Sequence, residues 1–590
     1  MSNGIGAAPG IAIGRAYVLP VWEWELPEKP GKETDLASEM DKLYSSIRFS
    51  REELEEIKSE IRELIGEEES HIFNAHLAIL DDPVFLNEVQ DIMKRQFKAA
   101  EVAVKEAIDK FVGMFDLLED EYMKERAGDI RDVGNRLLKH LLGDFQDVET
   151  PVEHPCISVG KELSPSQFAN LNLEKTLGVV TMLGGTTSHA AIMARAIGIP
   201  CVLGMEGKLN KPIQTGDLLI IDGSTGTVLV NPEIEEVEEY QNRKALQTEE
   251  KEILRKIVTI PPVTADGKRL EIRANINSVK ELTNALEYGV AGVGLFRTEF
   301  LFMERSIMPT EEEQFHIYQE ALGLLNGEPL TIRAMDIGGD KPVNYIALPQ
   351  EANPSMGLRA IRILLKRTDL FRTQLRAILR AGAYGKVKIL LPMVSSIDDI
   401  WKSKEIIADV ERELAEEGIT FGRNIPVGIM IELPAAAGVA DLMAQEVDFM
   451  SIGTNDLIQY VLGVDRMNEA VAELYEPFHP AVLRLLNHVA RAGCKAGIPV
   501  SICGEMAGDP LALPLWIGFG IHEVSMSVQS VLPFKSRLLA TNAERCKEIA
   551  EQVLTCRTSG EVRKLLTAAL PTTLPAPLTG DSKGEIANGA

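Results

Sequence analysis

Apolar residues recur at helical spacing between about residues 33 and 143. Asp81-Asp82-Pro83 separates one pair of helices in this region, and residues 99–143 supply one or two more. The simplest arrangement is a four-helix bundle. The longest helix is predicted by apolar positions spaced three, four or seven apart, namely Leu36, Met40, Leu43, Ile47, Leu54, Ile57, Ile61 and Leu64.

Strand-like patterns lie on both sides of this helical region. Residues 1–20 form one or two short apolar runs broken by glycines, too few to fold alone. Residues 146–230 alternate strands and turns, and residues 218–230 predict a β-hairpin through Asp-Gly and Thr-Gly turns. Together these segments predict one small α/β domain into which the helical bundle is inserted.

From residue 260 onward, apolar strands alternate with helical stretches, which predicts a (β/α)₈ TIM-type barrel. The chemistry of such a barrel gathers at the carboxyl ends of its strands. The predicted strands are Glu271–Ile276, Gly292–Arg297, Leu330–Asp336, Val387–Met393, Val427–Glu432, Asp448–Gly453, Val500–Gly504 and Glu523–Ser527.

The chain is therefore expected to be a multidomain α/β protein. A glutamate-rich helix without a wide apolar stripe links the small domain to the barrel and would let that domain swivel. The expected divisions are 1–32 and 144–230 for the α/β domain, 33–143 for the bundle, 231–259 for the linker helix, 260–570 for the barrel and 571–590 for a Pro- and Gly-rich disordered tail.

Composition narrows the function classes. The chain has 590 residues and a formal net charge of −27, which argues against nucleic acid or an anionic membrane as partner. No uninterrupted apolar stretch is long enough to span a membrane, and no secretion signal opens the chain. The six cysteines are dispersed without a Cys-x-x-Cys pair, so we expect a reducing, cytoplasmic location.

One candidate catalytic residue, His189, follows an apolar strand, two glycines and a run of hydroxyl residues. A helix-forming stretch begins at this point, so the imidazole is expected at a helix N-terminus. The positive field there opposes protonation and favours an anion, which suits a neutral imidazole that accepts a phosphoryl group. The alternative is a histidine that only caps the helix. His71 and His76 are five residues apart, a poor spacing for a joint metal site, and are expected in the core or on the surface.

Polar residues follow the predicted barrel strands. Arginines at the carboxyl ends of the barrel strands suit a compact anion that carries phosphate and carboxylate groups. Glu432 and Asp456 provide hard oxygen ligands from adjacent strands, which suits Mg²⁺. The alternative is that these residues form structural salt bridges. The residues concerned are Arg297-Thr298-Glu299, Arg333, Glu432, Asn455-Asp456, Arg466 and Cys503.

Several stretches resemble the phosphoenolpyruvate (PEP)-utilising enzymes. Residues 184–195 match the phosphohistidine signature of that family over twelve positions, and residues 448–460 match its second signature. Residues 297–300, 336–341 and 357–362 are similar to further family blocks. From about residue 4 to 570, the order of the segments resembles the Enzyme I family of the sugar phosphotransferase system.

The resemblance implies that PEP phosphorylates His189 and that Cys503 protonates the enolate carbon to give pyruvate. It implies that Glu432 and Asp456 bind Mg²⁺, that the helical insert binds the phosphocarrier protein HPr, and that the barrel forms a homodimer. Phe168 departs from the pattern, because some members carry a threonine there that steadies the imidazole; Ser164 or Ser166 could substitute. The implied PEP-binding residues are Arg297, Arg333, Asn455, Asp456 and Arg466, with Arg359 as a weaker candidate.

Other functions remain open at this point. Pyruvate phosphate dikinase and PEP synthase share both signatures but add an ATP-binding domain, for which the residues before His189 leave no room. A non-catalytic docking scaffold would not need the complete set of charged residues at the rim. A lyase or carboxylase acting on PEP within the barrel would not need His189.

Overall fold

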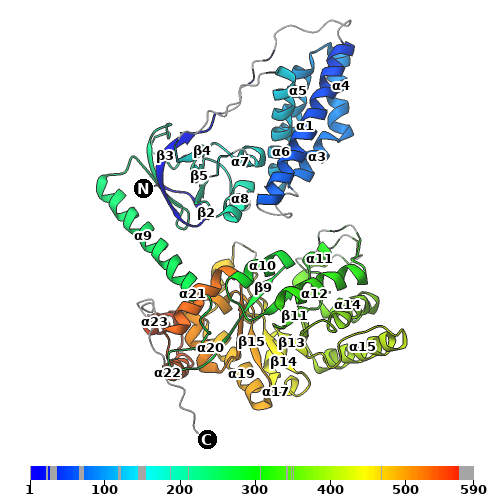
Figure 1. Cartoon of the computed structure of the whole chain (residues 1–590), viewed down its shortest axis with the longest axis vertical. Coiled ribbons are helices and arrows are strands. Elements are labelled where there is room, and N and C mark those ends of the chain that lie inside the picture. Colours follow the sequence, from blue (N-terminus) through cyan, green and yellow to red (C-terminus); the bar gives the residue numbers. More distant parts are fainter. Residues whose placement is uncertain are drawn as a thin grey trace. The chain divides into compact units, whose positions relative to one another are not determined.

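The computed structural model divides the chain into two compact units, residues 1–249 and 250–590, each of which is described by itself (Figure 1). His71, the block Asp340-Lys341 and the predicted tail from residue 571 lie outside the described residues. The described residues are 2–20, 24, 26, 36–64, 72–116, 121–143, 154–169, 171–173, 175–185, 188–209, 211–303, 305, 307–339, 343, 345–346, 349, 351–466, 468 and 470–570.

The first unit contains an eight-stranded sheet in the order β1-β8-β7-β3-β4-β5-β6-β2. The amino-terminal strand β3 (Ile11–Val18) lies between two strands from far along the chain, parallel to β4 and antiparallel to β7. Residues at the start of the chain therefore complete a sheet whose other strands follow the helical bundle. Those strands are β4 (Cys156–Gly160), β5 (Thr176–Thr181), β6 (Cys201–Leu203), β7 (Leu218–Asp222) and β8 (Thr227–Val230); β1 (Ser2–Asn3) and β2 (Ile5–Ala8) precede β3.

The predicted hairpin is confirmed, because β7 and β8 pair antiparallel. The carboxylate of Asp222 accepts hydrogen bonds from the backbone N–H groups of Ser224 and Thr225, at 3.0 and 3.4 Å. Gly226 has φ +76°, a conformation that a residue with a side chain rarely adopts. Side-chain capping and one glycine thus close the turn.

Between β3 and β4 the chain forms helices that pack on one another. The seam of the long helix is buried, with Leu43, Leu54, Ile57 and Ile61 each at most 5% exposed. Asp82 caps α4 by accepting from the N–H of Val84, and Pro83 occupies the first helical position, so the predicted break falls there. The described helices are α1 (Leu36–Leu64), α3 (Ile72–Leu80), α4 (Pro83–Gln96), α5 (Ala100–Asp116) and α6 (Glu121–Leu142), so the region has more than the four predicted.

The bundle and the sheet share one apolar core. Helix α8 (His189–Ile197) buries Ala190, Ala191, Met193 and Ala194, which belong to the same cluster as Leu137 and Leu138 of α6. The short helix α7 (Pro165–Ala169) contributes Phe168 to this cluster. In Figure 1, α7 and α8 lie on the side of the sheet that faces the bundle. The residues around His189 are therefore supported by both parts of the unit.

The second unit is a closed barrel of parallel strands in the order β10-β11-β12-β13-β14-β15-β16-β9. The predicted barrel is confirmed. Most of its strands are largely apolar and buried, as expected when both faces are covered, whereas Glu271–Ile276 alternates buried and partly buried residues. The strands are β9 (Glu271–Ile276), β10 (Val293–Arg297), β11 (Leu330–Arg333), β12 (Val387–Leu391), β13 (Val427–Ile431), β14 (Phe449–Ile452), β15 (Val500–Ile502) and β16 (Glu523–Met526).

Helices follow the barrel strands. Thr310 and Ser396 begin α12 and α15 with capping boxes, in which the side chain three residues on reaches back to the cap. Helix α9 (Ile234–Lys256) precedes the barrel, and the boundary between the two units falls within it. The remaining barrel helices of four or more residues are α10 (Val279–Glu287), α11 (Phe300–Met303), α12 (Glu311–Leu325), α13 (Ile361–Leu364), α14 (Thr368–Ala381), α15 (Ile397–Glu416), α16 (Pro434–Gly438), α17 (Ala440–Met443), α18 (Thr454–Leu462), α19 (Pro480–Ala496), α20 (Leu513–Phe519), α21 (Val528–Leu539), α22 (Ala543–Val553) and α23 (Ser559–Ala569).

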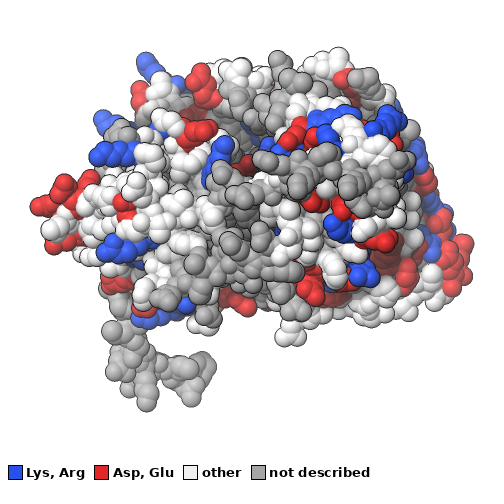
Figure 2. Space-filling view, turned by 90° about the horizontal axis from the view of Figure 1, so that it is seen from above, with Lys and Arg blue, Asp and Glu red and all other residues white. Residues whose placement is uncertain are grey.

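Two global properties bear on partners. Among the described helices, none combines the length and apolar character that crossing a bilayer requires. On the face shown in Figure 2, the described basic side chains are interspersed with acidic ones instead of forming one continuous patch. Nucleic acid would need such a basic surface.

Candidate active site

His189 is the first residue of α8, so its predicted place at a helix N-terminus is confirmed. The cap is Ser188, whose hydroxyl accepts from the N–H of Ala191 at 3.4 Å. The alternative of a helix-capping histidine is therefore wrong, because the serine fills that role. Gly184 has φ +106°, which lets the chain turn sharply between β5 and the cap. Thr186 and Thr187 lie outside the described residues.

The imidazole of His189 is 25% exposed, and its Nδ1 lies 3.9 Å from Oδ1 of Asp129 on α6. One ring nitrogen therefore faces a carboxylate of the bundle, while the side chain keeps access to solvent. The other nitrogen, Nε2, is the one that a carboxylate at Nδ1 leaves available as a nucleophile.

In the second unit, the predicted rim residues gather at the carboxyl ends of the strands. Arg297 and Arg333 are the last residues of β10 and β11. Glu432 and Cys503 each come directly after a strand, β13 and β15. Asn455 and Asp456 lie in the first turn of α18, after β14. Because the strands are parallel, all these residues lie at the same end of the barrel.

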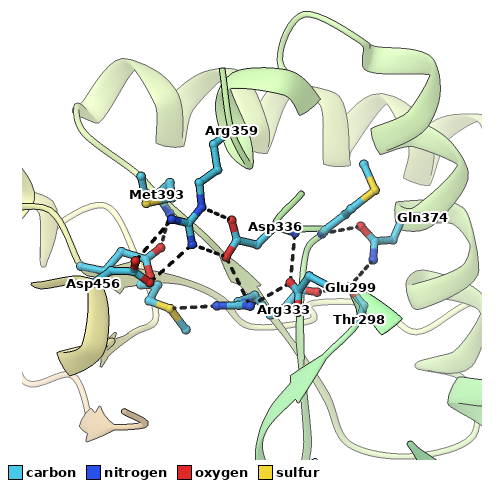
Figure 3. Close-up of polar contacts among 11 residues, drawn as sticks. Thr298, Glu299, Arg333, Asp336, Arg359, Gln374, Met393 and Asp456 are labelled. Atoms are coloured by element: carbon cyan, nitrogen blue, oxygen red, sulfur yellow. Dashed lines mark hydrogen bonds and ion pairs between the residues drawn. The ribbon is translucent and has the colours of Figure 1, made fainter. Parts of the chain in front are cut away.

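Two of the predicted arginines are held by carboxylates in a buried network (Figure 3). Arg333 Nη2 lies 2.8 Å from Glu299 and 3.3 Å from Asp336. Arg359 donates from Nε and Nη2 to Asp336 at 2.8 and 3.0 Å. Its Nη1 lies 3.3 Å from Asp456. For Arg333, the salt-bridge interpretation thus describes the structure correctly, and Arg359 is paired in the same way.

The electrostatics of the network keep both arginines charged. Burial opposes the charge of Arg333, yet Glu299 and Asp336 raise its pKa above the ordinary value. Burial likewise opposes the charge of Arg359, and Asp336 raises the pKa of that guanidinium. A fixed pair of cations is therefore present at this end of the barrel before any substrate binds.

The remaining two arginines differ from these. In the described part of the barrel, no carboxylate lies within ion-pair distance of Arg297 or Arg466. Burial and the neighbouring cation Arg333 lower the pKa of Arg297. An unpaired buried cation beside a second cation is costly until an anion binds. The arrangement can therefore bind a compact multivalent anion.

The carboxylates at this end suit a divalent cation. Glu432 is 1% exposed, and burial together with Asp456 and Asp336 raises the pKa of its carboxyl group. Oε1 of Glu432 accepts a hydrogen bond from the backbone N–H of Met393 at 2.5 Å. The carboxylate oxygens of Asp456 lie 3.3 and 3.5 Å from the guanidinium nitrogens of Arg359, so that ion pair is long. No group of three or more His, Cys, Asp or Glu side chains among the described residues is arranged to hold a metal ion, so the protein offers Mg²⁺ two hard oxygen ligands here, Glu432 and Asp456.

Cys503 lies at the same end, 2% exposed, with its thiol 3.5 Å from the carbonyl oxygen of Ile452. Burial raises the pKa of this thiol to about 11. The side-chain amide of Asn275 donates to the Cys503 carbonyl at 2.9 Å and so holds the backbone. At neutral pH the group is a thiol, which can give a proton to carbon.

The raised pKa predicts slow alkylation of Cys503. The reactive species is the thiolate, which burial disfavours in the folded protein at every pH below about 11. At pH 8, iodoacetamide is expected to label the exposed Cys494 at least about tenfold faster than Cys503, with the rate at Cys503 rising as the pH approaches 11. Peptide mass spectrometry over time measures both rates; equal rates would contradict the assigned protonation state.

The network includes residues that were not proposed as binding residues from the sequence. Glu299 and Asp336 are the carboxylates that hold Arg333, and they lie two and three residues after the last residues of β10 and β11. Both stand at ends of strands predicted from the sequence, but the sequence did not indicate that they pair with Arg333. Ala360, which follows Arg359, and Met393, whose N–H donates to Glu432, have positive φ angles of 52° and 54°. Strained backbone of this kind clusters at functional sites, but no sequence signal marks it at these residues.

Comparison with known families matches three parts of the chain. The family model described as "PEP-utilising enzyme, PEP-binding domain" matches residues 231–543, which is more than half of the chain. The model of the N-terminal region of the same enzymes matches residues 3–126, and that of their mobile domain matches residues 152–226.

Curated relatives are similar over nearly the whole chain. A phosphoenolpyruvate-protein phosphotransferase of Geobacillus stearothermophilus is 44% identical over 563 residues, covering 95% of this chain and 96% of that protein. One from Staphylococcus aureus (strain Mu50) is 42% identical over 564 residues, covering 96% and 98%. An NMR structure described as Enzyme I (nEIt) is 36% identical and covers 42% of this chain and all of that chain, with a TM-score of 0.35.

Proposed function

The chain belongs to the phosphoenolpyruvate-protein phosphotransferases, and from this premise we propose that it passes the phosphoryl group of PEP to its own His189 and then to a histidine of HPr. Pyruvate is released, and the transfer begins sugar uptake by the phosphotransferase system. The observation that carries the site assignment is the Arg297 guanidinium, which has no carboxylate partner among the described residues and lies beside Arg333 and the buried Cys503 thiol at the carboxyl end of the barrel.

In this proposal the arginines bind and orient PEP. Arg297, Arg333 and Arg466 hold its phosphate and carboxylate groups, since a guanidinium donates two parallel hydrogen bonds to either anion. Asn455 helps to align the substrate, and its side chain is itself held by Glu505, whose N–H donates to Asn455 Oδ1 at 2.8 Å. Arg359 contacts the phosphoryl group as it moves.

The phosphoryl transfer breaks the P–O bond of PEP and forms a P–N bond at Nε2 of His189. The electron pair left on the enolate takes a proton from the Cys503 thiol, which forms the methyl group of pyruvate, and the thiolate then recovers a proton from solvent. Glu432 and Asp456 would hold Mg²⁺, which when bound supplies charge neutralisation for the phosphoryl oxygens.

The proposed function also implies a protein partner, an oligomeric state and a cellular location. HPr docks on the helical insert, and the barrel forms a homodimer. The location is cytoplasmic, which fits the absence of disulfide bonds among the six cysteines, all of which lie in the described residues. The negative net charge suits a basic protein partner.

The test is labelling with ³²P-PEP and Mg²⁺. The full chain is expected to gain an acid-labile label that His189→Ala abolishes, since the substitution removes the accepting nitrogen. A matched control is His316→Ala, which removes an exposed imidazole of the barrel unit and should leave labelling unchanged. Label that persists in the His189 variant would refute the proposal, and so would absence of label in the unaltered chain, as expected for a scaffold.

A further inference from the structure

A buried polar cluster crosses the bundle and the α/β part of the first unit, next to His189. It runs from α3 through α6 to α7 and α8, and its central residues are almost inaccessible: His76 is 0% exposed, and the side chains of Asp129 and Asp132 are 8% and 7% exposed. Burial of so many ionisable groups is costly unless they hold one another in a defined arrangement.

The serines expected to support His189 are used elsewhere. Ser164 donates to Asp132 Oδ1 at 2.9 Å, and Ser166 donates to Asp132 Oδ2 at 2.6 Å. Phe168, buried at 1% exposure, has no polar atom to offer. Both hydroxyl protons therefore go to the bundle carboxylate, and among the described residues no hydrogen bond joins Ser164 or Ser166 to the imidazole of His189.

The contacts continue from Asp132 to His189. His76 lies between the two carboxylates of α6, with Nδ1 3.6 Å from Asp132 and Nε2 3.1 Å from Asp129. Asp129 Oδ1, which contacts His76, is also the atom 3.9 Å from Nδ1 of His189. Each member of the cluster is thus held by the next, and the last carboxylate faces the ring of the candidate nucleophile.

We propose that Asp129 is the positioning residue of His189: its carboxylate accepts the Nδ1–H of the imidazole and so keeps the lone pair on Nε2. This inference rests on the proposed function. Contacts between catalytic groups are often long in the free enzyme and shorten when substrate binds. The role resembles that of a carboxylate behind a catalytic histidine, which selects the tautomer and stabilises the positive charge that the ring acquires.

The proposal explains why the helical insert is packed against the small domain. The carboxylate that selects the nucleophilic nitrogen comes from α6, whereas the nucleophile comes from α8. The ring then gains charge as the P–N bond forms at Nε2, and a buried carboxylate at Nδ1 stabilises that change more than water would.

The experiment compares Asp129→Asn with Asp109→Asn in the full chain. Asp109 is an exposed carboxylate of the same bundle, paired with Lys105, and serves as the matched control. Two quantities are measured: the initial rate of ³²P labelling from PEP, and the His189 tautomer by long-range ¹H–¹⁵N correlation without PEP. An asparagine amide can donate to Nδ1 and so favours the Nε2–H form.

Asp129→Asn is expected to convert His189 from the Nδ1–H to the Nε2–H tautomer and to slow labelling by about 10²- to 10⁴-fold, as in other histidines that lose an orienting carboxylate. An unchanged tautomer overturns the inference even if the rate falls. Should Asp129→Asn not fold, Asp129→Glu decides the matter, because it must retain the Nδ1–H form. A tautomer change without labelling of the unaltered chain would instead refute the proposed function.

Discussion

Arg297→Lys is expected to slow labelling of His189 from PEP by at least about 10³-fold, within the range that a transition-state arginine contributes. Lysine keeps the positive charge but loses the planar fork that binds phosphate or carboxylate through two hydrogen bonds. Arg297 is the residue to test because it has no carboxylate partner in the described part of the barrel, so the substitution leaves no buried acid unpaired. Rapid-quench labelling under single-turnover conditions measures the rate.

The matched control is Arg273→Lys. Arg273 is also a barrel-strand arginine, on β9, but it is paired with Glu523 at 2.7 Å, whereas Arg297 has no acidic partner in the part of the chain that the structure describes. This variant should label within about threefold of the unaltered chain, because Arg273 is not among the arginines that are proposed to contact PEP. A rate for Arg297→Lys within tenfold of the unaltered chain would exclude Arg297 from the transition state.

Removal of the metal site is expected to slow phosphoryl transfer from PEP to His189 without slowing the later transfer from His189 to HPr. Glu432→Gln, or chelation with EDTA, should lower labelling of His189 by about 10³-fold, because a divalent cation supplies several kcal/mol of charge stabilisation to phosphoryl oxygens. The glutamine oxygen can still accept the N–H of Met393, so the local backbone is expected to remain in place.

The second transfer should not need the metal. A chain that is first labelled, then freed of PEP and treated with EDTA is expected to pass its label to HPr at an unchanged rate, because the barrel takes no part in that step. Glu544→Gln, which alters an exposed carboxylate paired with Lys547, is the control for Glu432→Gln. Loss of both transfers on chelation would contradict the separation of roles.

Most barrel strands were predictable because a strand covered on both faces is a short, largely apolar run, and β9 was predictable because polar and apolar residues alternate along it. The predicted Glu271–Ile276 coincides with β9, and the predicted start of β11 at Leu330 is correct. The ends were predicted less well: β11 stops at Arg333 although Ala334, Met335 and Ile337 beyond it are buried. Burial alone does not show where the backbone hydrogen bonds between strands end. An apolar run in the sequence can therefore continue beyond the last residue of its strand.

The end of β12 was also predicted too late: the strand ends at Leu391 and not at the predicted Met393. Met393 has φ +54°, and its N–H turns to the carboxylate of Glu432. Nothing in the local residues indicates this turn. It exists because a side chain from a neighbouring strand supplies the hydrogen-bond partner, and that partner is identified only when the barrel is closed.

The sequence by itself determined which polar residues gather near the carboxyl ends of the barrel strands and that His189 opens a helix, because periodicity and helix termini are short-range properties of the chain. Only the tertiary structure decided how the charges are shared. Arg333 and Arg359 are paired with carboxylates, Arg297 has no such partner among the described residues, and Ser164 and Ser166 donate to Asp132. Ion pairs and buried hydrogen bonds join residues far apart in the chain, and their energies depend on the burial and distances that folding creates.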